Sequence, residues 1–409
     1  MSHLTKLPSG EQEHLLGPDP LADVLRGAIR EVIQEALEEE VTEALGADVY
    51  VRVQTRRGHR NGSKTRTVTT PLGAKEIRVP RARVFETEGT SSEFQSRMLP
   101  RYERRTREVD EALLGVYLQG VNTRRVKAAL RPLLKGAALS KSTVSRVVAR
   151  VKELLEAWQR RPLQEETIVY AYLDALAVKV RIAKKITSVP VLVAVSVRED
   201  GTKALLGLWL RGSESEEAWK SILEDLTARG LRAPVLVIID GCPGLRAAVR
   251  KVWPGADVQR CTVHKLRNLM AHAPKHAHEE VTEDYHKIVY APNEKAAEKA
   301  YEAFVEKWSR LARGVARSLE EAGKELLTFL RYPKSQWKSL RTTNIIERLN
   351  EEFRRRVKTQ ASLPDEDAVL GIFYGLFAIG AIRMRKVEGY RQVNVVHLKR
   401  KEELRATGS

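Results

Sequence analysis

Cysteine is scarce in this sequence, since only Cys242 and Cys261 occur among 409 residues. This excludes a framework of several disulfides and suits a reducing compartment. Long hydrophobic runs are also missing: the longest, Ala368 to Ile382, has 15 residues including three glycines. It is shorter than a bilayer span and predicts a buried helix. The first residues lack a basic segment followed by an apolar stretch, so no secretory signal is expected.

Acidic residues are too few to balance the basic ones. The chain has 71 Lys and Arg against 53 Asp and Glu, a net charge of +18 and a pI near 9.8. Hydrophobic residues at 43% and charged residues at 30% are ordinary for a globular protein and exclude global disorder. Because no membrane anchor is evident, the positive charge indicates nucleic acid as the polyanionic partner.

The N-terminal region departs from this basic character. Residues 1–50 carry 3 basic and 11 acidic side chains, and residues 21–45 repeat apolar residues at helical spacing. An acidic amphipathic helix of this kind is a candidate for shielding the basic body or for dimerisation with another chain. Packing on its own domain is the simpler alternative.

The basic excess lies between residues 51 and 161. Residues 51–110 carry 15 basic and 7 acidic side chains, and the turn signals at Asn61-Gly62 and 71–73 predict a small β-ribbon with one basic face. Residues 120–161 carry 11 basic and 2 acidic side chains and predict a helix, a break and a second helix. Such a pair can place hydroxyls and long cations against a DNA groove. Helix pairs also occur in proteins that bind no DNA, so the charge is what favours DNA here.

From residue 167 the pattern becomes α/β. Three β-rich runs precede a helix, a buried strand that ends at Asp240, another helix and a short strand. This order predicts a mixed sheet covered by helices. Strand signals are absent from 265–335, which predicts an all-helical block, and a last amphipathic helix is expected over 344–357. Residues 389–409 are expected to form a mobile basic tail.

Two aspartates stand at positions where aspartate is uncommon. Asp174 interrupts an apolar strand, and Asp240 ends another, at the strand end where open α/β sheets meet ligands. Alone, Asp174 could face solvent and Asp240 could cap a turn. Together on neighbouring strands they would repel each other unless a divalent cation such as Mg²⁺ lay between them. Glu347, just before an arginine run, is the candidate third carboxylate; a surface ion pair is the alternative for it.

Cys261 and His264 form a Cys-x-x-His motif that resembles half of a zinc site. A complete site needs four ligands, and no second cysteine pair is present. We therefore expect no structural zinc. Cys261 is expected to pack beneath the sheet, and His264 to face a phosphate or a catalytic group.

Several motifs in order resemble the bacterial insertion-sequence transposases of the Mutator type, from about residue 50 to 385. They are RTVTTPLG, IRVPRAR, QGVNTRRV, LSKSTVSRV, WQRRPL, YLDALAVKVR, SESEEAWKSILEDLTARG, VIIDGCPGLRAAVRKVWPGADVQRCTVHKLRN and TTNIIERLNEEFRRRVK. The resemblance implies an α/β ribonuclease H-like core with a mixed five-stranded sheet that carries an all-helical insertion. It places the Asp, Asp, Glu triad on Asp174, Asp240 and Glu347, and the Cys-x-x-His signature on Cys261 and His264.

The activity implied by this resemblance is DNA transposition. The triad would bind two Mg²⁺ ions, for which Mn²⁺ can substitute, and would cleave DNA at terminal inverted repeats and transfer the strand into target DNA. A homodimer or larger assembly on paired ends, no membrane, and a cytoplasmic, nucleoid-associated location are expected. The residues expected to contact DNA are Arg124, Arg125, Lys141, Ser142, Ser145, Arg146, Arg260, His264, Arg267, Arg354, Arg355, Arg356 and Lys358.

The expected organisation has seven segments, and two other functions stay open. A non-enzymatic DNA-binding regulator explains the charge and the helix pair, but not the three acids. A related structure-specific nuclease, acting on RNA or on Holliday junctions, would use the same core chemistry. The segments are 1–50 (acidic helix), 51–86 (basic β-ribbon), 87–165 (helix-turn-helix-like), 166–264 (core, first part), 265–335 (helical insertion), 336–388 (final core helices with Glu347) and 389–409 (basic tail).

Overall fold

A computed structural model of the chain describes residues 20–71, 73–86, 90–118, 141–182, 185–357, 366–378, 382 and 384–406. The chain forms two compact units, Met1–Ala149 and Arg150–Ser409. The division falls within helix α5, Lys141–Gln159. Each unit is described by itself, and the seven-segment organisation stays a prediction.

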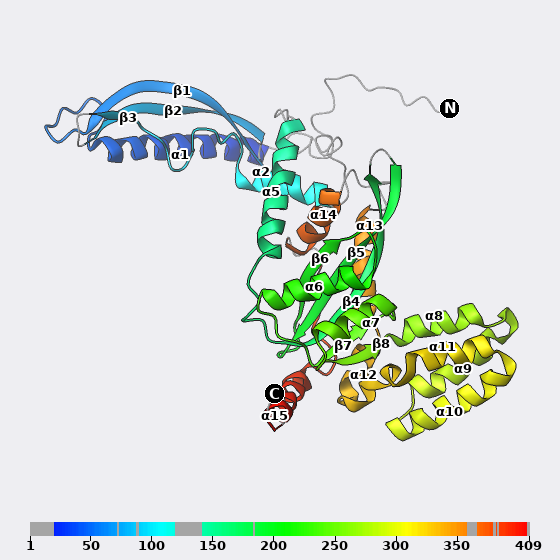
Figure 1. Cartoon of the computed structure of the whole chain (residues 1–409). Coiled ribbons are helices and arrows are strands. Elements are labelled where there is room, and N and C mark those ends of the chain that lie inside the picture. Colours follow the sequence, from blue (N-terminus) through cyan, green and yellow to red (C-terminus); the bar gives the residue numbers. More distant parts are fainter. Residues whose placement is uncertain are drawn as a thin grey trace, which may run out of the picture. The chain divides into compact units, whose positions relative to one another are not determined.

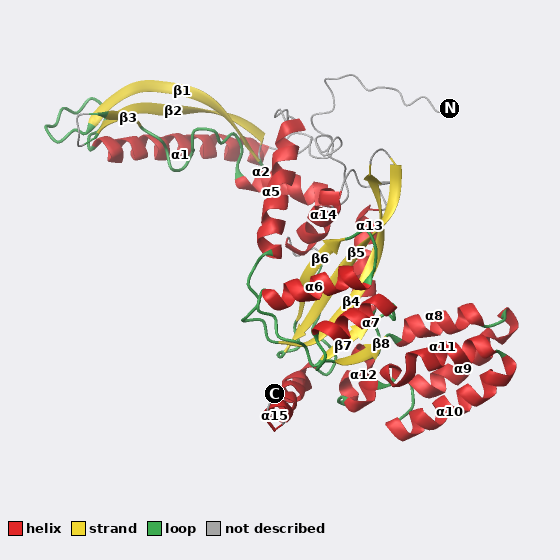
Figure 2. Cartoon of the chain, viewed as in Figure 1, coloured by secondary structure: helices red, strands yellow, loops and turns green. Residues whose placement is uncertain are grey.

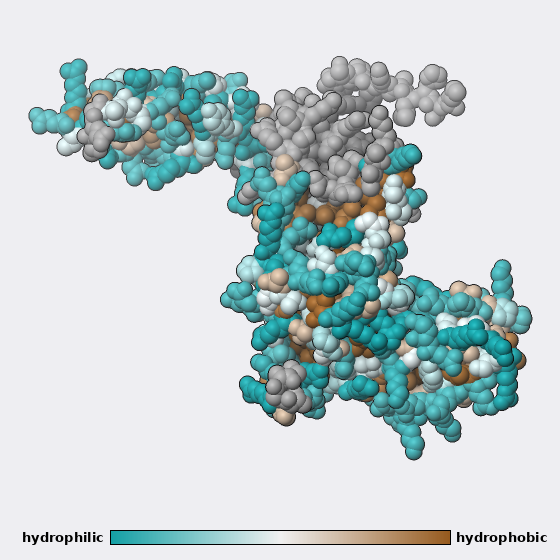
Figure 3. Space-filling model, in the orientation of Figure 1, coloured by the Kyte–Doolittle hydropathy of each residue, from teal (hydrophilic) through white to brown (hydrophobic). Residues whose placement is uncertain are grey.

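The N-terminal unit is a long β-ribbon with a helix along it (Figure 1). Its antiparallel strands are ordered β1-β2-β3, and the apolar side of α1 packs on them through Leu37, Val41 and Leu45. This packing on its own unit matches the simpler interpretation of the acidic helix. The visible surface of this unit is mostly hydrophilic (Figure 3). The elements are α1 (Pro20–Leu45), β1 (Gly58–Thr70), β2 (Gly73–Phe85), β3 (Ser91–Glu93) and α2 (Arg107–Leu118).

The prediction of a turn at Asn61-Gly62 is wrong. Strand β1 continues through both residues, and its register with β2 shifts between Arg60 and Ser63, which makes this point a β-bulge. Gly62 has a φ of +70°, a left-handed conformation that glycine adopts without strain in a bulge as readily as in a turn. The strands are instead joined beyond the Thr70–Gly73 pair, at the second expected turn.

The expected helix pair can be followed only in its second helix. Residues 119–140, with Arg124 and Arg125, lie outside the described residues. The second helix is α5, which begins at Lys141.

The second unit contains a five-stranded mixed sheet in the order β6-β5-β4-β7-β8 (Figure 2). Strands β5 and β6 are antiparallel to their neighbours, whereas β7 and β8 run parallel to β4. The order of strands and helices matches the sequence expectation. Ser215 caps α6 by accepting from the backbone N–H of Ala218. The elements are β4 (Ile168–Ile182), β5 (Lys185–Arg198), β6 (Lys203–Leu210), α6 (Glu216–Ala228), β7 (Leu236–Ile239), α7 (Pro243–Val252) and β8 (Asp257–Arg260).

Helices α6 and α7 cover one face of this sheet. Their buried side chains, among them Trp219 and Leu245, pack with Leu173 of β4 and Ile239 of β7. Because successive strand residues point to opposite faces, Asp174 faces away from this core. Tyr170 and Tyr172 share the face of Asp174, and their hydroxyls bond Gln336 and the carbonyl of Ser339.

All elements between β8 and α13 are helical, in agreement with the missing strand signals. Asn293 caps α10, where its side chain accepts from the N–H of Ala296. The α-helices are α8 (Thr262–His272), α9 (His278–Val289), α10 (Glu294–Leu311), α11 (Arg313–Ala322) and α12 (Trp337–Leu340); the short 3-10 helices are η1 (Lys275–Ala277), η2 (Gly323–Leu326), η3 (Thr328–Arg331) and η4 (Lys334–Gln336).

Two helices follow in the final region, α13 (Asn344–Val357) and α14 (Glu366–Ala378). As far as Ala378 the apolar run is helical, with most of its side chains buried, and Phe373 of α14 stacks on Phe353 of α13 at 3.8 Å between ring centroids. None of the helices among the described residues has the length and apolar character needed to cross a bilayer.

The C-terminal region is more ordered than expected. Residues Tyr390–Gln392 form η5 and Val393–Ala406 form α15. Val393 is fully buried. The expectation of a mobile tail is therefore wrong for this part.

Candidate active site

The sheet brings Asp174 and Asp240 side by side. β4 and β7 pair in parallel up to Leu173 and Ile239, so Asp174 and Asp240 are the next residues along these two neighbouring strands. Asp174 is buried, with 6% of its surface exposed. Its Oδ1 accepts from the N–H of Ala175 at 2.8 Å, and the Oδ1 of Asp240 accepts from the N–H of Cys242 at 2.9 Å.

The charge around Asp174 is unfavourable for a carboxylate. Burial, then the negative charge of Asp240 and, to the smallest extent, that of Glu347 together raise the pKa of Asp174 to about 7, while His264 opposes the shift. Asp240 and Glu347 therefore lie near enough to Asp174 for their charges to act on it. A buried carboxyl whose neighbours are also acids is typical of a catalytic or metal-binding site.

Glu347 lies in the first turn of α13. Its Oε1 is bound by an Arg267 guanidinium nitrogen at 3.0 Å and lies 3.7 Å from Nε2 of His264. Both basic residues stand on α8 three positions apart, which puts them on the same face of that helix. Glu347 is thus an acid held by two basic groups at the edge of the site.

Cys261 and His264 form a polar link between α8 and α13. Cys261 is fully buried, and its Sγ lies 3.4 Å from both the amide N and the Oγ1 of Thr343. Thr343 Oγ1 is also 3.4 Å from Nδ1 of His264. The hydrogen bond with Cys261 and the charges of Asp174 and Asp240 raise the pKa of His264 to about 9 despite partial burial. His264 is therefore protonated at neutral pH and adds positive charge beside the acids.

The donor set fits a hard divalent cation, since it consists of carboxylate oxygens that repel one another. Among the described residues, however, no group of three or more His, Cys, Asp and Glu side chains is placed closely enough to hold a metal ion. Glu347 is instead turned to Arg267. The charges of Asp240 and Glu347 act on Asp174, but the three acids do not form a complete set of metal ligands.

Arg260 does not have the expected position. It is 1% exposed, and its two terminal nitrogens bind the two carboxylate oxygens of Glu321 at 3.0 and 3.1 Å. Its guanidinium also lies against Gly241, where an added Cβ would come within 2.5 Å of it. Arg260 is a structural residue beneath the Asp240 turn and is not free to hold a phosphate.

One acid near the site was missed by the sequence analysis. Burial, and then the charge of Asp240, raise the pKa of Glu214, which precedes α6. The carbonyl of Glu214 is 3.5 Å from Sγ of Cys242. Its only sequence signal is its place in the conspicuous SESEEAW segment before the helix.

The remaining predicted DNA contacts are partly described. Arg354 and Arg355 are exposed on α13, and Arg355 pairs with Glu352. Lys358, like Arg124 and Arg125, lies outside the described residues. The structure describes only the helical backbone, and not the side chains, of five further residues: Lys141, Ser142, Ser145 and Arg146 on α5 and Arg356 on α13.

Comparison with known proteins agrees with the resemblance in the motifs. Residues 5–379 match the Mutator-family transposases. The chain is 37% identical over 354 residues to the transposase of insertion sequence element ISRM5 of Rhizobium meliloti, covering 87% of each chain. It is 38% identical over 336 residues to the transposase of IS406 of Burkholderia multivorans, covering 82% of this chain and 84% of that one.

One similar solved structure is the Drosophila P element transposase strand transfer complex. It is 12% identical, with a TM-score of 0.29, over 76% of this chain and 87% of that chain. This TM-score is too low to bear on the fold. The match over nearly the whole sequence and the identity to two insertion-sequence transposases show that the chain belongs to the Mutator family of transposases.

Proposed function

We propose that the chain cleaves DNA at the ends of an insertion sequence and joins those ends to target DNA, using Asp174, Asp240 and Glu347. The observation that carries this proposal is the parallel pairing of β4 with β7, which places Asp174 beside Asp240; the charges of Asp240 and Glu347 both raise the pKa of the buried Asp174. The five-stranded mixed sheet fits a ribonuclease H-like core, and the helical elements after β8 fit an insertion into it.

Asp174, Asp240 and Glu347 are the residues that would hold two Mg²⁺ ions, or Mn²⁺ in their place. When bound, such ions activate the attacking oxygen and stabilise the leaving oxygen of a phosphodiester. We expect no zinc in the role of a structural metal. The acids act as ligands, so their replacement by amides abolishes chemistry while leaving DNA binding.

Two successive reactions would use the same site. In the first, a water oxygen bonds to phosphorus at the transposon end, and the bond to the 3′ oxygen breaks to release a 3′-hydroxyl. In the second, that hydroxyl oxygen bonds to a target phosphorus and displaces a 3′ oxygen of the target strand. His264 and Arg267 line this edge of the site and would hold the scissile-strand phosphate by charge-assisted hydrogen bonds.

The basic N-terminal regions, 51–86 and 87–165, would bind the terminal inverted repeats. Joining two ends requires two sites, so we propose a homodimer or larger assembly on paired ends. Because its proposed substrate is DNA, we propose a cytoplasmic, nucleoid-associated location in a bacterial cell.

The test is strand cleavage of labelled end DNA in Mg²⁺ by Asp240→Asn. Glu224→Gln removes one negative charge from the exposed side of α6 and is the control. We expect cleavage to disappear in Asp240→Asn and to persist in the control, with DNA affinity retained in both. Normal cleavage by Asp240→Asn would refute the assignment. Tight DNA binding with no cleavage by the unaltered chain would favour the regulator, and preference for junctions over duplex ends would favour the structure-specific nuclease.

A further inference from the structure

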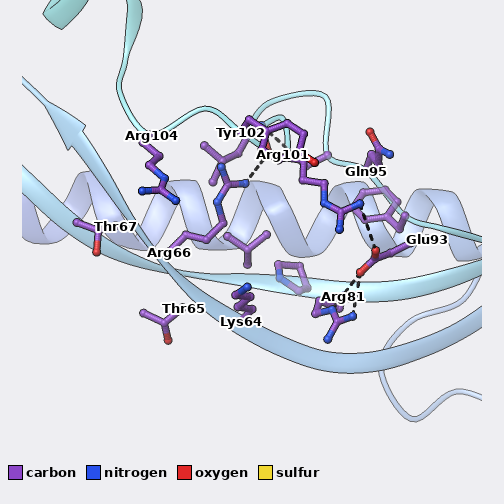
Figure 4. Close-up of a pocket in the computed structure, with 15 residues that line it drawn as sticks. Lys64, Thr65, Arg66, Thr67, Arg81, Glu93, Gln95, Arg101, Tyr102 and Arg104 are labelled. Carbon is purple, nitrogen blue, oxygen red and sulfur yellow. Dashed lines mark hydrogen bonds and ion pairs between the residues drawn. The ribbon is translucent and has the colours of Figure 1, made fainter. Parts of the chain in front are cut away.

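Within the regions proposed to bind DNA, the N-terminal unit contains a basic groove whose lining includes none of the individual residues predicted to contact DNA. The groove has a volume of about 640 Å³ and runs between the ribbon and residues 94–104 (Figure 4). We refer to it as the ribbon groove. Its charged lining consists of one acid, Glu93, and five cations, Lys64, Arg66, Arg81, Arg101 and Arg104.

Arg66 fixes the wall of the ribbon groove. Its guanidinium donates to the carbonyl of Leu99 at 3.1 Å, to that of Pro100 at 2.9 Å and to that of Glu103. Leu99 and Val79 in turn pack on the core formed by α1 and the ribbon. The groove is therefore a built part of this unit, and Arg66 acts as a positioning residue in it.

The positive charge in the ribbon groove is only partly neutralised. Arg81 and Arg101 share Glu93, at 2.9 and 3.9 Å. Lys64 and Arg104 are both exposed, and within the part of the chain that the structure describes neither side chain has an ion pair or hydrogen bond. The charge of Arg104 also helps to lower the pKa of Arg66, after burial, which indicates that the cations repel one another.

The chemistry of the lining suits a phosphate backbone. Proteins hold DNA phosphates with Lys and Arg, aided by hydroxyl and amide groups, and here Thr67 and Gln95 lie beside the cations. Single-stranded DNA is instead bound on successive aromatic side chains. The lining offers one strongly exposed aromatic residue, Tyr102, with 86% exposure. The arrangement favours duplex over single strands.

We propose that the ribbon groove binds the phosphate backbone of duplex DNA, with Lys64 and Arg104 as its principal contacts. This inference rests on the proposed function, because it assumes that the chain acts on DNA. The ribbon groove also crosses the expected segment boundary at residue 86, because strands β1 and β2 form it together with residues 93–104.

The test measures the salt dependence of duplex binding by Lys64→Gln/Arg104→Gln in the full chain. Each phosphate contact that is lost lowers the slope of log affinity against log salt by about 1, so we expect a decrease of about 2. The decrease should be equal for end DNA and for a scrambled duplex, because phosphate contacts carry no sequence information. Unchanged circular dichroism checks that the variant is folded.

The matched control is Arg97→Gln/Arg107→Gln, which removes the same charge from exposed positions of this unit outside the groove. A decrease confined to the groove variant supports the proposal. Equal slopes in all proteins, equal decreases in both variants, or a larger loss for single strands would overturn it. Cleavage is scored separately: if Asp240→Asn still cleaves while the groove variant binds weakly, the proposed catalytic site fails and the groove stands.

Discussion

Two clusters of charged residues at the same end of the sheet differ in how their charges are balanced. At Glu321, the buried cations Arg260 and Lys265 surround one acid, and hydrogen bonds and charges from both outweigh burial and lower the pKa of Glu321 to about 2. At Asp174, acids face acids, and the pKa rises to about 7. In the first cluster the charges balance, whereas in the second the neighbouring acids disfavour the charged form of Asp174 and His264 opposes this effect only in part. Buried charge alone therefore does not mark a functional site; its lack of balance does.

The largest effect is expected for Asp174→Asn, which should reduce strand cleavage without loss of stability. Asp174→Asn should reduce cleavage by on the order of 10³-fold, since metal-ion catalysis contributes several kcal/mol. Without divalent ions its free energy of unfolding should be unchanged or higher, because an unfavourable carboxylate is removed. Strand cleavage and chemical denaturation measure the two. A clear loss of stability together with normal cleavage would reverse the roles of the clusters.

Glu321→Gln should show the opposite pattern. It leaves Arg260 buried without its counter-charge, which should lower the free energy of unfolding by about 3 kcal/mol, at the low end for a broken buried pair because Glu321 is half-exposed. The neighbouring exposed Glu320→Gln on the same helix is the control, with little change expected. If the two variants unfold at equal denaturant concentrations, the Glu321 cluster does not stabilise the fold.

The pH dependence of this difference provides a finer test. The pKa of Glu321 is about 2 in the folded chain, below its ordinary value of 4.5, so the folded state binds fewer protons than the unfolded state between these values. The stabilisation is complete above pH 4.5 and is lost as the pH falls toward 2. The difference in unfolding free energy between the unaltered chain and Glu321→Gln should shrink over this range. A constant difference would show that the ion pair does not cause it.

The smallest effect is expected for Arg267→Gln. Arg267 is 61% exposed at its side chain, so its ion pair with Glu347 should contribute less than about 1 kcal/mol to stability. Denaturation of Arg267→Gln beside Glu321→Gln compares an exposed pair at the catalytic edge with a buried structural pair. A loss as large as that of Glu321→Gln would mean that both clusters serve the fold.

Local patterns in the sequence predicted much of the fold. The helix over 344–357 and the strand that ends beside Asp240 lie where the sequence pattern placed them. The Asn61-Gly62 turn failed because a glycine with positive φ serves a bulge equally well. The helix α15 was missed because its charged sequence resembles a tail.

The site could be predicted only in part. Asp174 and Asp240 were found because each breaks an apolar strand, and that signal is local. The role of Arg260 at the end of β8 was not predictable, because its partner Glu321 lies 61 residues further on, in helix α11, with no pattern linking the two. The ribbon groove was missed for the same reason, since Arg101 and Arg104 join the cations of the ribbon only when residues 94–104 fold back over it.

The central claim is that the three carboxylates bind divalent cations on a DNA phosphate. Its most direct test is Mn²⁺ binding, followed by electron paramagnetic resonance, to the chain with end DNA bound. The unaltered chain should hold two ions that Asp174→Asn/Asp240→Asn does not hold, while both proteins bind the DNA. Equal Mn²⁺ binding by the two proteins would contradict the claim.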